Sequence, residues 1–169
     1  MSSVLASWNE ADEAAAFGAM IVCCGARRWA GKMVSFRPIK NISELSANAD
    51  RAWSTMEEAD WMEAFSCHPR IGVSTASNSN ERSGTWSRQE QASTASASDR
   101  VLSELAAGNA LYEQRFGFTY IVCATGKSAD EMLGILNRRL NSDRATELRE
   151  AAEQQRQILQ IRLGKWLVS

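Results

Sequence analysis

The chain has 169 residues, of which 44% are hydrophobic, and 19 Lys and Arg residues almost balance 20 Asp and Glu residues. This length can bury a sizeable core, so we predict a single domain over residues 1–169. The formal net charge of -1 excludes a strongly basic nucleic-acid-binding surface or a general attraction to anionic membranes. No segment approaches the roughly 20 apolar residues of a spanning helix, and no signal-peptide pattern opens the sequence. We therefore expect a soluble, cytoplasmic protein.

Helical periodicity organises the first third of the chain. Apolar residues recurring every three or four positions predict helices over 10–22, 26–35, about 41–56 and 57–66. Asn9 is the expected N-cap of the first helix and Gly25 its expected end, while Asn41 or Ser43 caps the third. The fourth helix leads directly to residue 68.

The segment His68-Pro69-Arg70-Ile71-Gly72 holds the only histidine of the chain and one of its two prolines. Imidazole is the one side chain whose ordinary pKa, about 6.5, makes both protonation states available near neutral pH. Pro69 biases His68 away from helical backbone, so the imidazole is expected on a turn. A lone histidine is often structural or merely exposed, so its neighbours must decide between that reading and catalysis.

The second half of the chain alternates polar turns with helices. Residues 73–84 are small and polar and predict a surface loop, with a mobile lid as one possible role. We predict two helices in series over 85–97 and 98–115, then a helix capped by Ser128 and a last helix over 144–166. Residues 116–124 are rich in β-branched and aromatic residues, but no other segment can pair with them as a strand. The fold expected is therefore all-α, a compact array of about eight helices with an extended segment near 117–124.

Four cysteines, Cys23, Cys24, Cys67 and Cys123, lack the Cys-x-x-Cys spacing of zinc or redox sites. We expect free thiols and no metal. Cys67 precedes His68, which suggests a nucleophile pair, but adjacent side chains usually point apart. A buried or inert Cys67 is therefore the favoured interpretation.

Ser87, Glu90 and Gln91 can edge one pocket because Ser87 lies one helical turn before Glu90. Such side chains suit a ligand crowded with amide N–H and C=O groups. The structural alternative is a helix-capping box, whose Ser-x-x-Glu spacing they satisfy. Arg162 interrupts an apolar helix face and either reaches solvent or binds a carboxylate or carbonyl in a pocket. Residue spacing alone leaves both alternatives open.

Together these segments resemble the 2-oxo-4-hydroxy-4-carboxy-5-ureidoimidazoline (OHCU) decarboxylase family. The resemblance rests on His-Pro-Arg-Ile-Gly at 68–72, Ser-Arg-Gln-Glu-Gln at 87–91, and Phe-Gly-Phe at 116–118 followed by Tyr120 to Ala124. It extends to Arg-Pro at 37–38, Arg-Leu-Asn at 139–141 and Ile-Arg-Leu at 161–163, so it covers nearly the whole chain. One departure is Thr119, where family members often have proline.

The resemblance implies a cofactor-free, all-α, homodimeric enzyme that binds a small ureide and needs no nucleic acid or membrane. It implies His68, Glu90 and Arg162 as catalytic residues. The implied substrate-binding residues are Pro69, Ser87, Arg88, Gln89, Glu90, Gln91, Tyr120, Ile121, Val122, Cys123 and Ala124. Association with the upstream hydrolase of the pathway is a further expectation.

The implied reaction is decarboxylation of the ureidoimidazoline to (S)-allantoin in urate catabolism. Loss of CO₂ next to an unsaturated ring leaves an electron pair that ring nitrogen can delocalise, so no pyridoxal or thiamine group is required. His68 is the right residue type to deliver the one proton. A non-catalytic helical adaptor or ligand-binding domain is the alternative function.

Overall fold

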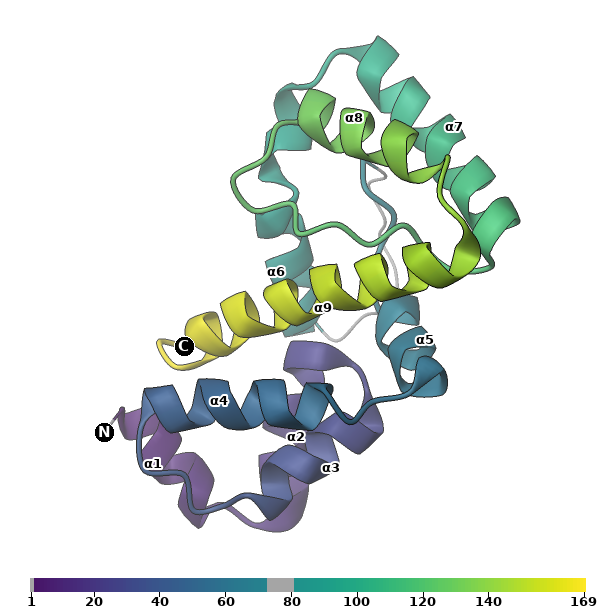
Figure 1. The fold of residues 1–169 in the computed structure, drawn as a ribbon. Coiled ribbons are helices and arrows are strands. Elements are labelled where there is room, and N and C mark those ends of the chain that lie inside the picture. Colours follow the sequence, from purple (N-terminus) through teal and green to yellow (C-terminus); the bar gives the residue numbers. More distant parts are fainter. Residues whose placement is uncertain (1, 73–80) are drawn as a thin grey trace. The chain divides into compact units, whose positions relative to one another are not determined.

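The computed structural model describes residues 2–72 and 81–169, and helices are the regular secondary structure of this part, without a strand (Figure 1). The described residues form nine α-helices, which are α1 (Ser3–Glu10), α2 (Glu13–Cys24), α3 (Arg27–Ser35), α4 (Ile42–Trp53), α5 (Glu58–Ser66), α6 (Glu81–Glu90), α7 (Asp99–Phe116), α8 (Ala129–Arg139) and α9 (Arg144–Trp166), with a 3₁₀-helix η1 (Ala92–Ser96) after α6. The all-α prediction is confirmed.

Backbone packing divides the chain into two compact units. The first unit comprises Met1–Ala64 with Arg156–Ser169, and the second comprises Phe65–Gln155. Both α5 and α9 therefore contribute residues to each unit. The prediction of one domain over 1–169 stays a prediction.

The first helix of the first unit was missed by the sequence prediction. Asn9 does not cap a helix that starts at residue 10, because α1 already includes Asn9 and the next helix is capped by Asp12, whose carboxylate accepts from the Ala15 N–H. The Asn9 amide instead pairs with the backbone of Ile39, donating to its carbonyl at 2.8 Å and accepting from its N–H at 2.9 Å. A side chain that matches a peptide group in this way replaces a missing backbone partner.

The next two helices follow the prediction closely. Asn41 caps α4 by accepting from the Glu44 N–H, which decides between the two expected caps. Trp29 of α3 is fully buried and donates to the Ala49 carbonyl of α4 at 3.1 Å. Buried indole N–H groups need such a partner, so this hydrogen bond fixes how the two helices pack.

The second unit corrects the predicted loop over 73–84. Residues 73–80, where the lid was suggested, lie outside the described residues, whereas residues 81–84 form the first turn of α6. The predicted helix over 85–97 is instead the end of α6 followed by the separate 3₁₀-helix η1. Polar composition indicated a loop at 81–84, but Glu, Arg and Ser are also compatible with a helical turn.

The predicted extended segment near 117–124 is confirmed. Gly117 ends α7 with a φ of 82°, a left-handed conformation that favours glycine. The chain then runs through Phe118 to Ala124 without helix or strand, and these residues other than Thr119 are buried. Tyr112 contacts Phe116 and Tyr120 with ring centroids 4.7 and 5.3 Å apart, so an aromatic cluster covers this backbone.

None of the described helices is both long enough and apolar enough to span a bilayer.

Candidate active site

The turn that carries His68 is held against α7 at two places. Arg70 donates twice to the carboxylate of Glu113, at 2.8 and 2.6 Å, and Asn109 donates to the Ile71 carbonyl at 3.0 Å. The His68 N–H bonds the Phe65 carbonyl at 3.1 Å, which closes the end of α5. The imidazole is half-buried, and its Nε2 atom is shielded from solvent. The helix–turn junction thus presents the imidazole from a firmly held backbone, as Pro69 predicts.

A hydrogen bond connects this turn to the end of α6. The Gly72 N–H donates to the side-chain oxygen of Gln91 at 3.1 Å. Gly72 has a φ of 78°, which lets the chain leave the turn in a direction that other residues rarely adopt. The segments 68–72 and 87–91 are separated along the chain, but they lie next to each other in the second unit.

The capping-box interpretation of Ser87 and Glu90 is wrong. A capping serine must precede its helix, but α6 begins at Glu81, so Ser87 lies inside it and Glu90 is its last residue. The Ser87 side chain is buried and that of Glu90 is half-buried. The capping box in this part of the chain is Ser128 with Glu131, at the start of α8. Ser87 and Glu90 need another explanation.

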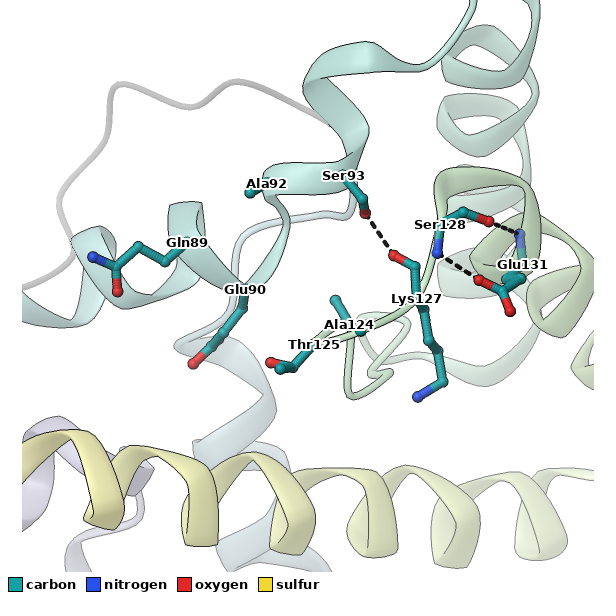
Figure 2. A pocket seen from close by; sticks show the side chains of 10 residues that line it. Gln89, Glu90, Ala92, Ser93, Ala124, Thr125, Lys127, Ser128 and Glu131 are labelled. Carbon is teal, nitrogen blue, oxygen red and sulfur yellow. Dashed lines mark hydrogen bonds between the residues drawn. The ribbon is translucent and has the colours of Figure 1, made fainter.

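A pocket of about 440 Å³ opens beside Glu90. It is bounded by the end of α6, by η1, by the loop that precedes α8 and by Glu131 of α8 (Figure 2). Its lining residues are Gln89, Glu90, Ala92, Ser93, Ala124, Thr125, Gly126, Lys127, Ser128 and Glu131. Figure 2 shows the Glu90 carboxylate and the Thr125 side chain extending into the space between α6 and the loop. A volume of this size suits a small polar molecule.

The extended segment that reaches this pocket is held by side chains rather than by strand pairing. Arg139 of α8 donates from Nη1 to the Ile121 carbonyl at 2.6 Å. The Cys123 N–H donates to Gln154 of α9 at 2.8 Å, and Lys127 donates from Nζ to the Cys123 carbonyl at 2.8 Å. The segment is therefore preorganised up to Ala124, which lines the pocket.

Behind the segment lies a buried ion pair between Arg139 and Glu147, whose side chains are 3% and 1% exposed. The Tyr112 hydroxyl donates to the same carboxylate at 2.5 Å. Burial by itself would lower the pKa of the Arg139 guanidinium, but the Glu147 carboxylate and Tyr112 raise it, so the residue stays charged. Burial also raises the pKa of Tyr112 and of Tyr120. A buried pair of this kind holds its place only because all of its members are hydrogen-bonded.

The structure brings many of the predicted site residues into one compact unit. Gln89, Glu90 and Ala124 line the pocket, and Gln91 joins the His68 turn. Arg88 is exposed and bonds Thr85 at 3.0 Å. Pro69 belongs to the His68 turn, and the extended segment contains Tyr120, Ile121, Val122 and Cys123. The roles assigned to these residues stay predictions.

Arg162 belongs to the first unit, so its placement gives no test of its predicted role. Its side chain is only 1% exposed, which excludes the alternative that it reaches solvent. A buried guanidinium requires polar partners.

Sequence reasoning missed Thr125, Lys127 and Ser93 of the pocket lining. The signal was present as the polar run Thr-Gly-Lys-Ser at 125–128, directly after the segment predicted to bind substrate. Among the described residues, no three His, Cys, Asp or Glu side chains gather in a way that could hold a metal ion.

The second unit thus places one imidazole on a turn, one carboxylate at a pocket and a buried backbone segment held by side chains. The sequence profile of OHCU decarboxylases matches residues 9–164. The chain belongs to the OHCU decarboxylase family.

Individual relatives agree with this assignment. The chain is 35% identical over 145 residues to the uric acid degradation bifunctional protein TTL of Arabidopsis thaliana, and 28% identical over 157 residues to the OHCU decarboxylase of Amia calva. These matches include 85% and 87% of this chain, but 45% and 83% of the respective relatives. The chain thus spans less than half of the bifunctional protein.

Solved structures show the same fold. A crystal structure of an OHCU decarboxylase in the presence of (S)-allantoin superposes with a TM-score of 0.75 at 33% identity, over 88% of this chain and 96% of that one. A crystal structure of an (S)-allantoin synthase gives 0.71 at 17% identity, over 96% of this chain and 53% of that one, which supports the fold alone.

Proposed function

We propose that this chain decarboxylates 2-oxo-4-hydroxy-4-carboxy-5-ureidoimidazoline to (S)-allantoin and CO₂ without a cofactor. The observation that carries the proposal is the pocket that joins Glu90 of one family motif with Ala124 of another. His68 is not among its lining residues, but Gln91, which follows Glu90, accepts from the Gly72 N–H of the His68 turn. The structure of a relative obtained with (S)-allantoin supports a ureide ligand.

The chemistry needs little beyond orientation and one proton. The bond between the hydroxyl-bearing ring carbon and the carboxylate breaks, CO₂ leaves, and the electron pair is delocalised through the adjacent C=N bond onto ring nitrogen. The neighbouring ureido-bearing carbon is then protonated, which creates the stereocentre, while the hydroxyl loses its proton and becomes the ring carbonyl of allantoin. His68 supplies the proton as general acid, an effect worth about 10²–10⁴ in rate. The negative charge of Glu90 supports His68 or the substrate hydroxyl.

Recognition of the substrate is assigned to groups that match a ureide. Ser87 and Gln91 offer side-chain donors and acceptors, and the backbone of residues 120–124 offers N–H groups. Arg162 is proposed to bind a carboxylate or carbonyl of the substrate, because its planar fork fits such oxygens.

The proposed context is a cytoplasmic homodimer. Two relatives, the bifunctional uric acid degradation proteins of Arabidopsis thaliana and Bacillus subtilis, contain a matching region within longer chains. They support an association between this chain and the upstream hydrolase of the pathway. Sedimentation of the purified chain, alone and with that hydrolase, tests both statements.

The decisive experiment feeds freshly generated substrate to the purified chain and follows the optical activity of the allantoin that forms. We expect rapid, stereospecific production of (S)-allantoin, whereas spontaneous decay gives racemic product. Racemic allantoin at the uncatalysed rate would contradict the proposal. Binding of (S)-allantoin without turnover would instead favour the alternative function, a non-catalytic ligand-binding domain.

A further inference from the structure

Three successive peptide units of the extended segment are each hydrogen-bonded to a different side chain. The unit between Ile121 and Val122 is held by Arg139 through the Ile121 carbonyl, at 2.6 Å. The next unit is held by Gln154, which accepts from the Cys123 N–H at 2.8 Å. The third is held by Lys127 through the Cys123 carbonyl, also at 2.8 Å.

Because a trans peptide unit is planar, a hydrogen bond at one end of the unit fixes the direction of the group at its other end. The carbonyl of one residue and the N–H of the next point to opposite sides of a single rigid plane. Arg139 therefore turns the Val122 N–H away from itself, and Lys127 turns the Ala124 N–H away from its ammonium group. A helix or strand would fix these N–H groups through backbone pairing, but this segment belongs to neither.

Further contacts hold the side chains of Arg139 and Gln154 and the backbone of Lys127. Arg139 is paired with the buried carboxylate of Glu147. Gln154 donates from Nε2 to Glu150, one turn earlier in α9, at 3.1 Å. The backbone carbonyl of Lys127 accepts from the Ser93 hydroxyl at 2.6 Å. Preorganised donors of this kind cost no reorganisation when a ligand binds.

Two of these hydrogen bonds come from positively charged side chains, those of Arg139 and Lys127. A cation bonded to a peptide carbonyl polarises the unit, so the N–H at its other end becomes a stronger donor. The affected N–H groups are those of Val122 and Ala124, and Ala124 lines the pocket with Glu90. Oxygen atoms of a carboxylate or a ureide carbonyl are the acceptors that such donors favour.

We propose that Arg139, Gln154 and Lys127 are positioning residues that orient the Val122 and Ala124 N–H groups, and strengthen them as donors, for the substrate oxygens. None of these three side chains was assigned a role by the sequence. The inference rests on the proposed function, since it requires that the segment 120–124 binds the ureide.

The test begins with Lys127→Met, because Lys127 is half-buried and its loss leaves the core intact. We expect KM and the dissociation constant of (S)-allantoin to rise together by about five- to tenfold, because one hydrogen bond to the substrate is weakened. The kcat should stay within twofold of that of the unsubstituted chain. Lys127→Arg retains a cationic donor and should restore most of the affinity. Arg138→Met removes one exposed charge from α8 and serves as the matched control, with no expected change.

A readout without substrate separates this inference from the proposed function. In the ligand-free chain, Lys127→Met should shift the amide resonance of Ala124 and speed its hydrogen exchange. Gln154→Leu should do the same at Cys123, and Gln154→Glu should restore the exchange rate because it keeps the acceptor. A rise in KM with an unchanged Ala124 amide would mean that Lys127 contacts substrate directly, and would overturn the inference. An unchanged KM in an active Lys127→Met chain would also overturn the inference. If the unsubstituted chain is inactive but the substitutions give the expected amide shifts, only the proposed function is contradicted.

Discussion

At the scale of single residues, His68 has no substitute, because the chain holds no second imidazole. Its N–H closes α5 through the backbone, so a change of side chain leaves that hydrogen bond in place. The residue can therefore be altered without altering the turn that carries it.

We predict that His68→Asn folds normally and decarboxylates at close to the spontaneous rate. Asparagine can hydrogen-bond but cannot exchange a proton near neutral pH. Single-turnover kinetics, with circular dichroism as the folding control, measure the loss. Retention of more than a tenth of kcat would exclude His68 as the proton donor.

For Glu90, the structure excludes one of the two roles that the sequence allowed. A capping role is removed by the start of α6 at Glu81, and a carboxylate at a helix C-terminus opposes the helix dipole. Glu90→Gln should therefore leave the melting temperature unchanged or slightly raised. If the charge supports catalysis, kcat should fall about a hundredfold or more, equivalent to about 2.7 kcal/mol in the transition state. Turnover like that of the unsubstituted chain would leave His68 without a charged assistant.

At the scale of elements, the start of α8 decides where the pocket loop ends. The Ser128 hydroxyl accepts from the Glu131 N–H at 3.1 Å, and the Glu131 carboxylate accepts from the Ser128 N–H at 2.6 Å. That second hydrogen bond lowers the pKa of Glu131 below its ordinary value of 4.5. Both residues also line the pocket, so this cap fixes one of its walls.

Replacement of Ser128 by Ala should lower the free energy of unfolding by about 1 kcal/mol, as the loss of an N-cap usually does. The Ser128→Thr variant keeps a hydroxyl and is the matched control. Chemical denaturation measures the difference. The contribution of Glu131 has its own signature: a lowered folded-state pKa gives stability that is present above pH 4.5 and is lost as pH falls through the folded-state pKa. The difference between Glu131→Gln and the unsubstituted chain should shrink over that acidic range.

At the scale of the whole molecule, the chemistry is expected to need no metal. One histidine and four cysteines without paired spacing cannot make an ordinary zinc site.

Treatment with EDTA should leave kcat and KM unchanged, and zinc added afterwards should not raise activity. Assays before and after dialysis against the chelator measure this. Activity that disappears with EDTA and returns with zinc would require a different mechanism and a metal site that the spacing of the ligands does not predict.

The sequence by itself determined the all-α class, most helix limits and the family. The helices over 26–35, 41–56 and 144–166 were predictable because apolar residues recur at helical spacing and because Asn41 is a strong cap. The extended segment was predictable for a different reason, since a strand-like run without a possible partner has to remain single.

Only the tertiary structure decided what depends on contacts between distant residues. The pattern Ser-x-x-Glu fits a cap or a pocket equally well, and the choice followed from where α6 begins. Asn9 similarly has the composition of a cap, yet its amide serves the backbone of Ile39, 30 positions away. Arg139 and Gln154 could not be assigned from sequence because local spacing carries no record of which peptide group a long side chain will reach after folding.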